Sequence, residues 1–254
     1  IQVLFRAEEK DVKLLKKYLT TKPVRTGSGV AVVAVMTKPM KCPHGRCAMC
    51  PGGPKSHFGS VPQSYTGYEP ATMRAKRNKY DPYLQIFNRL EQYVVLGQSP
   101  EKVELIIMGG TFPGYPKEYK DEFILYSYKA MNDFSSMFYA KGELNITKFK
   151  KFFELPGKVG NKARTKRIHA KLLKLKSLRP GSISKEQERN TKSCIKCVGL
   201  TIETRPDYGL LQQGHEMLKY GCTRVELGVQ SVYDQALTRI ERGHNTITSI
   251  LSTR

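Results

Sequence analysis

The stretch Val30-Ala-Val-Val-Ala-Val-Met36 leads directly into the loop Lys41-Cys42-Pro-His-Gly-Arg-Cys47-Ala-Met-Cys50-Pro51. An unbroken apolar run rich in β-branched residues predicts a strand that is buried on both faces of a parallel sheet. The loop after such a strand lies at the carboxyl edge of the sheet, where α/β barrels place their active sites. The pattern therefore predicts an α/β protein with three cysteines at its functional edge.

The three cysteines, Cys42, Cys47 and Cys50, have a C-x4-C-x2-C spacing. Plant-type ferredoxins share this spacing but need a further cysteine to close their cluster. The next cysteine is Cys194, far along the chain, so the spacing favours a four-iron cluster with one iron left without a protein ligand. A zinc site with His44 or a distant cysteine as its fourth ligand is the second interpretation. Three reduced thiols in a glycine-rich loop are the third.

Strand and helix signals alternate along the rest of the chain. Strands are expected at 30–36, 102–108, 197–203 and 224–229, and helices at 71–78, 82–96, 117–132, 210–220 and 234–241. Strands regularly separated by helices predict βαβ units and a parallel sheet. No further unit follows residue 244, so we expect a partial (βα) barrel, incomplete at the C-terminus, with an exposed edge strand and apolar surface.

The chain has 254 residues, 39% of them hydrophobic, which is enough for one sizeable core plus an extension. We expect a basic N-terminal extension at 1–21 and a barrel domain at 22–254 with a Lys/Arg-rich insertion at about 141–192. The net charge of +21 favours a polyanionic partner, with nucleic acid as the first candidate. The insertion alone is also compatible with a solvated charge run.

No apolar run approaches the length of a membrane span, and the N-terminus lacks a signal-peptide cleavage site. Six cysteines, three of them grouped like metal ligands, are typical of a reducing compartment. We therefore expect a soluble, cytoplasmic protein that does not enter a membrane.

The ordered motifs KPMKCPHGRCAMCPGGP, QSYTGYEP, MGGTFP, LTIETRPD, YGCTRVELGVQS and RGH extend over about residues 22–244. Together they resemble the radical S-adenosylmethionine (SAM) domain of the Elongator catalytic subunit family, the tRNA uridine carboxymethyl-synthases. The short cysteine spacing suggests the archaeal type. The resemblance implies a radical SAM barrel, and it implies that Cys42, Cys47 and Cys50 hold a 4Fe-4S cluster whose open iron binds SAM.

The resemblance also implies the reaction, which is that of an acyltransferase-class enzyme. A 5′-deoxyadenosyl radical would be generated at the cluster, and a carboxymethyl group derived from acetyl-CoA would be attached to C5 of the wobble uridine of tRNA. The protein would supply binding and orientation, and the cofactor would carry the radical chemistry.

The resemblance assigns site residues as well. SAM contacts are implied for residues at or beyond strand ends, namely Gly109, Gly110, Thr111, Glu203, Glu226 and Gln230. For the two glycines, an ordinary strand-ending turn is the competing interpretation. Ribose or substrate contacts are also considered for Arg205, and for each of the polar residues Glu203, Arg205, Glu226 and Gln230 a structural ion pair, such as Glu203 with Arg224, is an equal alternative. Lys102 matches a lysine that the family associates with acetyl-CoA, although a lysine before a strand is usually just solvated.

Aromatic and basic residues are interleaved after the cysteine loop, as stacking on an extruded base and contact with phosphates would require. The residues expected to bind RNA are Tyr65, Tyr68, Arg74, Lys76, Arg77 and Lys79, with plain helix-surface charge as an equal alternative. The pair Cys194 and Cys197 could form half of a zinc site, but ordinary thiols are favoured there.

Members of this family continue with further barrel strands and an acetyltransferase domain that holds acetyl-CoA, and neither is visible in this sequence. We therefore expect that the chain does not complete carboxymethylation alone. The expected partners are tRNA and either further copies of the chain or the Elongator-type subunits that the resemblance implies. The rival hypothesis from another class is a zinc-stabilised, non-catalytic nucleic-acid-binding module. Protein acetylation as the main activity is the least supported.

Overall fold

The computed structural model describes residues 11, 15, 18, 23–158, 160–178 and 181–254. The predicted extension at 1–21 thus lies almost entirely outside the described residues. The chain forms two compact units. Unit 1 contains the described residues up to Val33 together with Ile86–Val103 and Leu125–Val198, and unit 2 contains Ala34–Gln85, Glu104–Ile124 and Gly199–Arg254.

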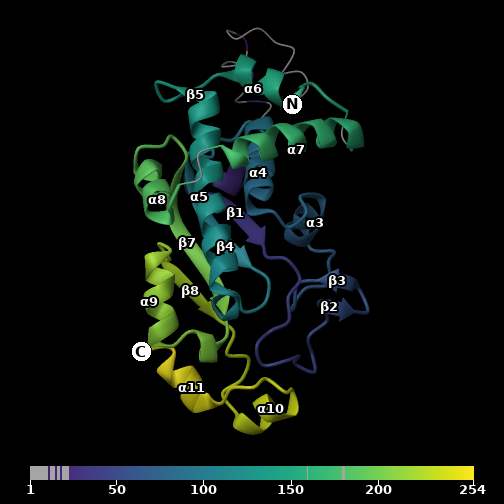
Figure 1. Ribbon diagram of the computed structural model, residues 1–254, viewed down its shortest axis with the longest axis vertical. Helices are drawn as coiled ribbons and strands as arrows, with labels where there is room; N and C mark the ends of the chain where they lie inside the picture. Colours follow the sequence, from purple (N-terminus) through teal and green to yellow (C-terminus); the bar gives the residue numbers. More distant parts are fainter. Residues whose placement is uncertain (1–10, 12–14, 16–17, 19–22, 159, 179–180) are drawn as a thin grey trace. The chain divides into compact units, whose positions relative to one another are not determined.

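The central sheet has four strands in the order β1-β4-β7-β8 (Figure 1). These are β1 (Ala31–Met36), β4 (Lys102–Met108), β7 (Lys196–Thr204) and β8 (Arg224–Leu227). Strands β7 and β8 run parallel, and their register places Glu203 opposite Glu226. The predicted α/β fold with a parallel sheet is confirmed, and each strand begins and ends within two residues of its expected bounds.

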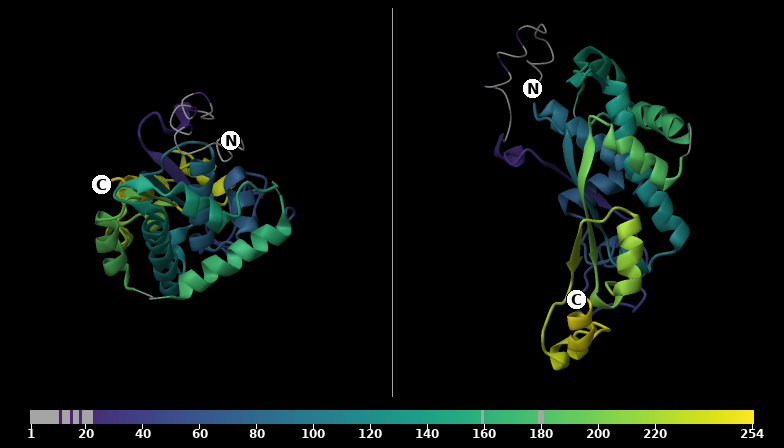
Figure 2. Two further views of the ribbon diagram at one scale, coloured as in Figure 1. Left: turned by 90° about the horizontal axis from the view of Figure 1, so that it is seen from above. Right: turned by 90° about the vertical axis from the view of Figure 1, so that its left-hand side faces the viewer.

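Unit 2 carries the loops at the carboxyl ends of the strands. Its elements are β2 (Gly53–Ser56), β3 (Gly59–Val61), α3 (Pro70–Arg77), η2 (Phe112–Gly114), η3 (Pro206–Tyr208), α9 (Leu211–Lys219), α10 (Asp234–Arg239) and α11 (Thr246–Leu251). The first part of α5 (Lys117–Phe138) also belongs to it. Helix α9 lies alongside β8 in Figure 1 and in the right-hand view of Figure 2.

Unit 1 holds the Lys/Arg-rich insertion, which is largely helical. It contains η1 (Pro23–Thr26), most of α4 (Pro82–Val95), the rest of α5, β5 (Tyr139–Ala140), β6 (Glu143–Leu144), α6 (Ile146–Phe153), α7 (Lys162–Ser177) and α8 (Ile183–Thr191). Helix α5 extends six residues beyond its predicted end at 132. The reason is an aromatic cluster in which Phe134 and Phe138 of α5 contact Phe149 and Phe153 of α6, all four fully buried.

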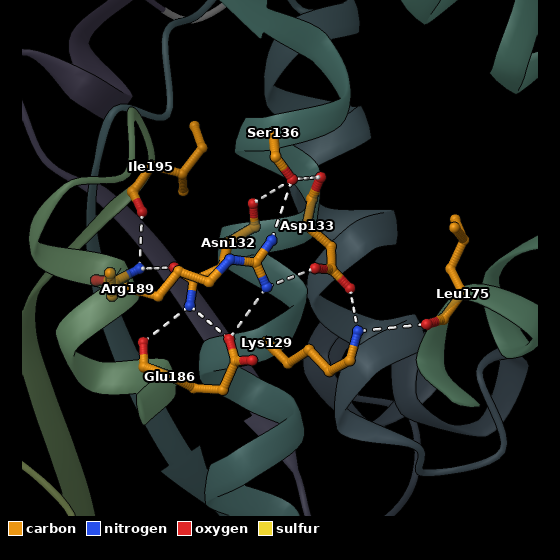
Figure 3. Close-up of polar contacts among 9 residues, drawn as sticks. Lys129, Asn132, Asp133, Ser136, Leu175, Glu186, Arg189 and Ile195 are labelled. Carbon is orange, nitrogen blue, oxygen red and sulfur yellow. Dashed lines mark hydrogen bonds and ion pairs between the residues drawn. The ribbon is translucent and has the colours of Figure 1, made fainter. Parts of the chain in front are cut away.

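Polar contacts, the amide ones buried and the Arg189 one exposed, attach α8 to α5 (Figure 3). The Asn132 amide donates to the backbone carbonyl of Glu186 at 2.8 Å and to its carboxylate at 2.7 Å. Asn190 donates to the Asn132 amide oxygen at 2.7 Å and to the Ile195 carbonyl at 3.0 Å. Arg189 pairs with Asp133 at 2.8 Å. Because paired polar groups inside a protein define one arrangement, these contacts fix α8 against α5 within unit 1.

Strand β8 is the last in the sheet order, and its first three residues are exposed. Large apolar side chains are exposed nearby in sequence, including Leu218 at 67%, Val232 at 67% and Ile250 at 49%. The expectation of an exposed edge strand with apolar surface is therefore confirmed for β8. In the described part of the chain, none of the helices combines the length and the apolar character that crossing a membrane requires.

Candidate active site

The cysteine loop is held by one buried glutamine. Gln63, 4% exposed, accepts a hydrogen bond from the Cys42 backbone N–H through its side-chain oxygen and donates to the Gly45 carbonyl at 3.1 Å. Gly52 lies so close to the following turn that a Cβ there would overlap the carbonyl oxygens of Pro62 and Tyr65. The loop is thereby fixed against the β2–β3 region, with Cys42 and Cys47 buried and Cys50 half-buried.

Each cysteine sulfur has a polar neighbour. Thr111 Oγ1 lies 3.5 Å from Cys42 Sγ, and the Ser64 backbone N–H donates to Cys50 Sγ at 3.2 Å. Cys47 Sγ has two polar neighbours, both of them basic side chains. Such contacts are typical of thiolate ligands, because N–H and O–H donors stabilise negative charge on sulfur.

The two basic side chains at Cys47 are His44 and Arg242. His44 Nε2 lies 3.1 Å from the sulfur, and Arg242 Nη1 donates to it at 3.4 Å. Burial lowers the pKa of His44 to about 4, helped by the guanidinium groups of Arg205 and Arg242. The imidazole is therefore neutral at pH 7, and Arg242 is the charged neighbour of this sulfur.

Burial also acts on the first cysteine of the loop. It raises the pKa of the Cys42 thiol, while the hydrogen bond with Thr111 and the Arg205 guanidinium oppose that rise. A desolvated thiol loses its proton readily only when a metal or another strong positive charge stabilises the thiolate. The protein alone therefore leaves Cys42 mostly protonated.

The cysteines open onto a cavity of about 430 Å³ in unit 2. The predicted residues that line it are Cys42, Cys47, Cys50, Gly110, Thr111, Glu203, Glu226 and Gln230. The lining also includes Arg205, which the sequence placed with Glu203 as a candidate for ribose or substrate contacts, and four residues with no predicted role in SAM binding, namely His44, Gln63, Ser64 and Arg242. The fold thus collects around one cavity side chains that follow β1, β4, β7 and β8.

The Gly109-Gly110 turn shapes one wall of this cavity. Both residues have positive φ angles, 112° and 87°, and residues that carry a Cβ rarely adopt such angles. A Cβ on Gly109 would lie 2.5 Å from Thr37 Oγ1, and one on Gly110 would lie 2.5 Å from the Tyr115 hydroxyl. The turn accordingly brings backbone close to the cavity, where Thr111 is 1% exposed.

Two carboxylates stand at the ends of the neighbouring strands β7 and β8. The Tyr65 hydroxyl donates to Glu203 at 2.7 Å. Burial raises the pKa of the Glu203 carboxyl, the hydrogen bond from Tyr65 opposes the rise, and repulsion from Glu226 adds to it. The structural ion pair considered for Glu203 is found instead at Glu226, whose carboxylate pairs with Arg224 at 3.1 Å. Glu203 is thus the carboxylate that faces the cavity without a cationic partner among the described residues.

The RNA-binding predictions divide into two groups. Tyr68, 73% exposed, and the exposed Lys76, Arg77 and Lys79 lie at the surface as expected. Arg74 is 6% exposed and donates to the Ala34 carbonyl at 2.5 Å, so its predicted contact with RNA is wrong.

Tyr65 also differs from its predicted role. Its hydroxyl is committed to Glu203, and burial beside that carboxylate raises the Tyr65 pKa far above its usual range. A half-buried ring in this place does not fit stacking on an extruded base. The burial of Tyr65 and Arg74 depends on contacts with β7 and β1, which local sequence does not reveal.

The surface aromatic group is larger than the sequence indicated. The Phe58 ring packs edge-on against Tyr68, with centroids 6.2 Å apart, and His57 packs on Phe58 at 5.5 Å. All three residues are exposed. Exposed rings beside lysines are the composition of a base-stacking surface, and the signal that could have found it was the His-Phe pair at the tip of the hairpin.

The remaining predicted residues lie elsewhere. Lys102 is exposed at the first residue of β4, in unit 1, and is not part of the cavity lining.

Cys194 and Cys197 are half-buried, and their backbone N–H groups donate to Ser135 and Asn190. Within the described residues no three Cys, His, Asp or Glu side chains converge as ligands of a single ion.

Glu69 organises the turn before α3 and gives a pH-dependent prediction. Its carboxylate accepts hydrogen bonds from Thr66 N–H and Oγ1, Gly67 N–H and Thr72 Oγ1 at 2.7–3.0 Å. Burial alone raises the pKa of Glu69, but these hydrogen bonds outweigh it and lower the pKa from 4.5 to about 2. The lowered pKa means that the unfolded chain binds a proton more readily than the folded one.

The stabilisation by Glu69 is therefore fully present above pH 4.5 and declines as the pH falls toward 2. Glu69→Gln should lower the free energy of unfolding by about 1–2 kcal/mol at pH 7, allowing for solvent screening of a partly exposed group. The difference should shrink below pH 4.5 in urea titrations performed at several pH values. A difference that stays constant down to about pH 3 would contradict this account.

The parallel sheet and the cysteine loop at its carboxyl edge define a partial radical SAM fold. A solved structure, the archaeal Methanocaldococcus infernus Elp3 with an N-terminal deletion (1–46), matches with a TM-score of 0.55 and 32% identity, covering 88% of this chain and 34% of that one. No family model matches the sequence.

Curated relatives agree with the structural match. A tRNA uridine(34) acetyltransferase of Methanocaldococcus infernus is 44% identical over 253 residues, covering 100% of this chain and 39% of the relative. Elongator complex protein 3 of Homo sapiens is 43% identical over 237 residues, covering 91% of this chain and 35% of the relative. The chain belongs to the family of these proteins and spans about 39% of the length of its archaeal relatives.

Proposed function

We propose that this chain forms the radical-generating part of an enzyme that modifies the wobble uridine of tRNA. The observation that carries the proposal is the cysteine loop with polar neighbours on all three sulfurs, opening onto a cavity of about 430 Å³. Three thiolates on one loop are the ligands of a 4Fe-4S cluster that keeps one iron open. The names of the relatives supply the substrate class, uridine 34 of tRNA.

The residues present fit such a cluster. Cys42, Cys47 and Cys50 lie on a single loop at the cavity wall, and each thiolate of such a cluster would bind a different iron. Arg205 and Arg242 bring two positive charges to the cavity wall. Two buried nitrogens there, His44 Nδ1 and Arg242 Nε, have no hydrogen-bond partner in the described structure. Polar atoms of this kind suit an anionic group in the cavity.

When bound, the cluster and SAM supply the radical chemistry that attaches the carboxymethyl group. The chain binds and orients both groups. The Gly109-Gly110 turn admits close backbone approach, and Thr111 offers a hydroxyl beside Cys42. Glu203, held by Tyr65, presents carboxylate oxygens to the cavity, which suits the hydroxyl groups of a ribose. Glu226 and Gln230 complete that side, with Gln230 in a left-handed backbone conformation at φ 72°.

Binding of tRNA is proposed for the basic surface. Helix α7 contains no acidic residue and seven Lys or Arg in KARTKRIHAKLLKLKS, and its buried side is formed by Ile168 and Leu172. Lys171 pairs with Glu154 at 3.0 Å, whereas the exposed Lys162, Lys166 and Lys174 are available to phosphates. The aromatic group of His57, Phe58 and Tyr68 with Lys76, Arg77 and Lys79 is the proposed base-stacking surface.

Acetyl-CoA as a co-substrate, with Lys102 as a contact, and assembly with partner subunits are part of the same proposal. They are supported by the relatives' names, which include an acetyltransferase and a protein of the Elongator complex.

The test is anaerobic reconstitution with iron and sulfide, metal analysis, and electron paramagnetic resonance (EPR) spectra of the reduced protein. We expect about four irons per chain and a change in the reduced signal when SAM is added. Stoichiometric zinc without iron would instead support the non-catalytic nucleic-acid-binding module. If the EPR signal of the iron-loaded protein does not change when SAM is added, the proposed SAM chemistry is wrong.

A further inference from the structure

Arg242 is a buried arginine between α10 and α11 with an unusual set of partners. It is 8% exposed. One terminal nitrogen donates to the Gly228 carbonyl at 2.7 Å, and the other donates to Cys47 Sγ at 3.4 Å. A Cβ on Gly228 would lie 2.7 Å from this guanidinium, so glycine at that position makes room for it. The guanidinium is thus placed against the sulfur by the backbone that follows β8.

The charge of Arg242 has no carboxylate partner in the described structure. The neighbouring Arg205 differs, because Asp207 binds its guanidinium through two hydrogen bonds of 2.8 Å. Arg205 instead fixes the position of Arg242 by donating to its backbone carbonyl at 2.5 Å. Arg242 has only neutral oxygen and sulfur acceptors, and its Nε is buried without a partner.

A buried charge without a counter-charge is costly, because burial removes the water that would otherwise solvate it. The fold therefore retains a positive charge that the protein does not neutralise, in direct contact with a cysteine of the proposed cluster site. An iron–sulfur cluster bound by three thiolates is anionic and gains a further negative charge on reduction. Hydrogen bonds to the sulfurs and nearby charge set the reduction potential of such clusters.

We propose that Arg242 sets the reduction potential of the cluster, by donating to Cys47 Sγ and by neutralising the charge that reduction adds. This inference rests on the proposed function, since it requires a cluster at the three cysteines. Arg242 acts through Cys47 and is a positioning residue, not a catalytic one. Arginine suits this role because it keeps its charge at every physiological pH and presents several donors in a rigid plane.

Arg46 offers a matched control in the same loop. Its guanidinium is exposed and donates to the Cys50 backbone carbonyl at 2.9 and 3.2 Å, not to a sulfur. Solvent screens its charge. Replacing Arg46 or Arg242 by Gln removes one positive charge from the neighbourhood of the cysteines, but only Arg242→Gln removes a desolvated donor to sulfur.

The experiment is an EPR-monitored redox titration of the anaerobically reconstituted chain, with iron content determined for each variant. Arg242→Gln should make reduction at least tenfold less favourable, a shift of about 59 mV to more negative potential for one electron. Arg46→Gln and Arg242→Lys should each change the redox equilibrium less than threefold. An iron-loaded Arg242→Gln protein with the wild-type potential would overturn the inference.

Two further outcomes are distinguishable. If Arg242→Gln takes up no iron, Gly228→Ala decides the question, because a Cβ there would displace the Arg242 guanidinium. A more negative potential in the iron-loaded Gly228→Ala protein supports the inference, and the wild-type potential contradicts it. If the wild-type chain itself takes up no iron under the same conditions, the proposed cluster site is wrong, and the inference is wrong with it. Circular dichroism of every variant establishes that the fold is retained.

Discussion

Replacing Cys42, Cys47 and Cys50 together by Ser is expected to reduce the iron content from about four per chain to nearly zero. The three thiolates are the only proposed protein ligands, and a serine hydroxyl neither ionises at neutral pH nor binds iron comparably. The broad visible absorption of the reconstituted protein should disappear with the iron. Single substitutions should lower the iron content strongly as well, because each cysteine holds a different iron.

The matched control is the double variant Cys194→Ser, Cys197→Ser, which removes two half-buried thiols from unit 1. It should retain the full iron content and the wild-type spectrum. Equal loss of iron in this control and in the triple variant would contradict the assignment of the cluster to the loop. Retention of iron by the triple variant would contradict it directly.

The second large effect is expected for exposed lysines of the insertion. Lys151 of α6 and Lys162, Lys166 and Lys174 of α7 are exposed, and none of them forms an ion pair within the described structure. Changing all four to Gln should weaken the binding of an unmodified tRNA transcript by about tenfold for each phosphate that is no longer bound near 0.1 M salt. The slope of log K against log salt should become shallower by about 0.7–0.9 for each such phosphate.

The control is the variant in which the same four lysines are changed to Arg, because it keeps every positive charge. It should bind with the wild-type affinity and salt slope. Substitution is preferable to removing the whole insertion, since Phe149, Phe153, Ile168 and Leu172 from this segment are buried in unit 1 and their removal would disrupt its core. An unchanged slope in the Gln variant would show that phosphates are bound elsewhere.

Local patterns were sufficient for most of the fold. The β-branched apolar runs predicted the strands, and the regular helix spacing predicted the parallel sheet. Helix α5 is the exception, since it continues to Phe138 because its last turns pack on Phe149 and Phe153. That packing partner comes from the basic insertion, whose charge suggested a solvated segment and concealed its apolar positions.

The sequence predicted only those parts of the site whose residues lie close together along the chain. Cys42, Cys47 and Cys50 are close in sequence, so their spacing alone predicts that all three bind the same metal group. Gln63 and Arg242 had no predicted role, because the atoms they contact come from distant segments. The prediction for Arg74 was wrong because the local sequence does not show which way a basic side chain on a short helix points. Arg74 donates to the Ala34 carbonyl and does not face solvent.

The sequence by itself determined the fold class and the family, and it predicted the ligand set in the loop, since each depends on residue type and short-range spacing. Only the tertiary structure decided which charges are buried and what each one faces. It places Tyr65 on Glu203, separates the paired Arg205 from the unpaired Arg242, and directs Arg242 at Cys47. Desolvation and hydrogen-bond direction arise only when distant segments pack together, and they control the electrostatics of this cavity.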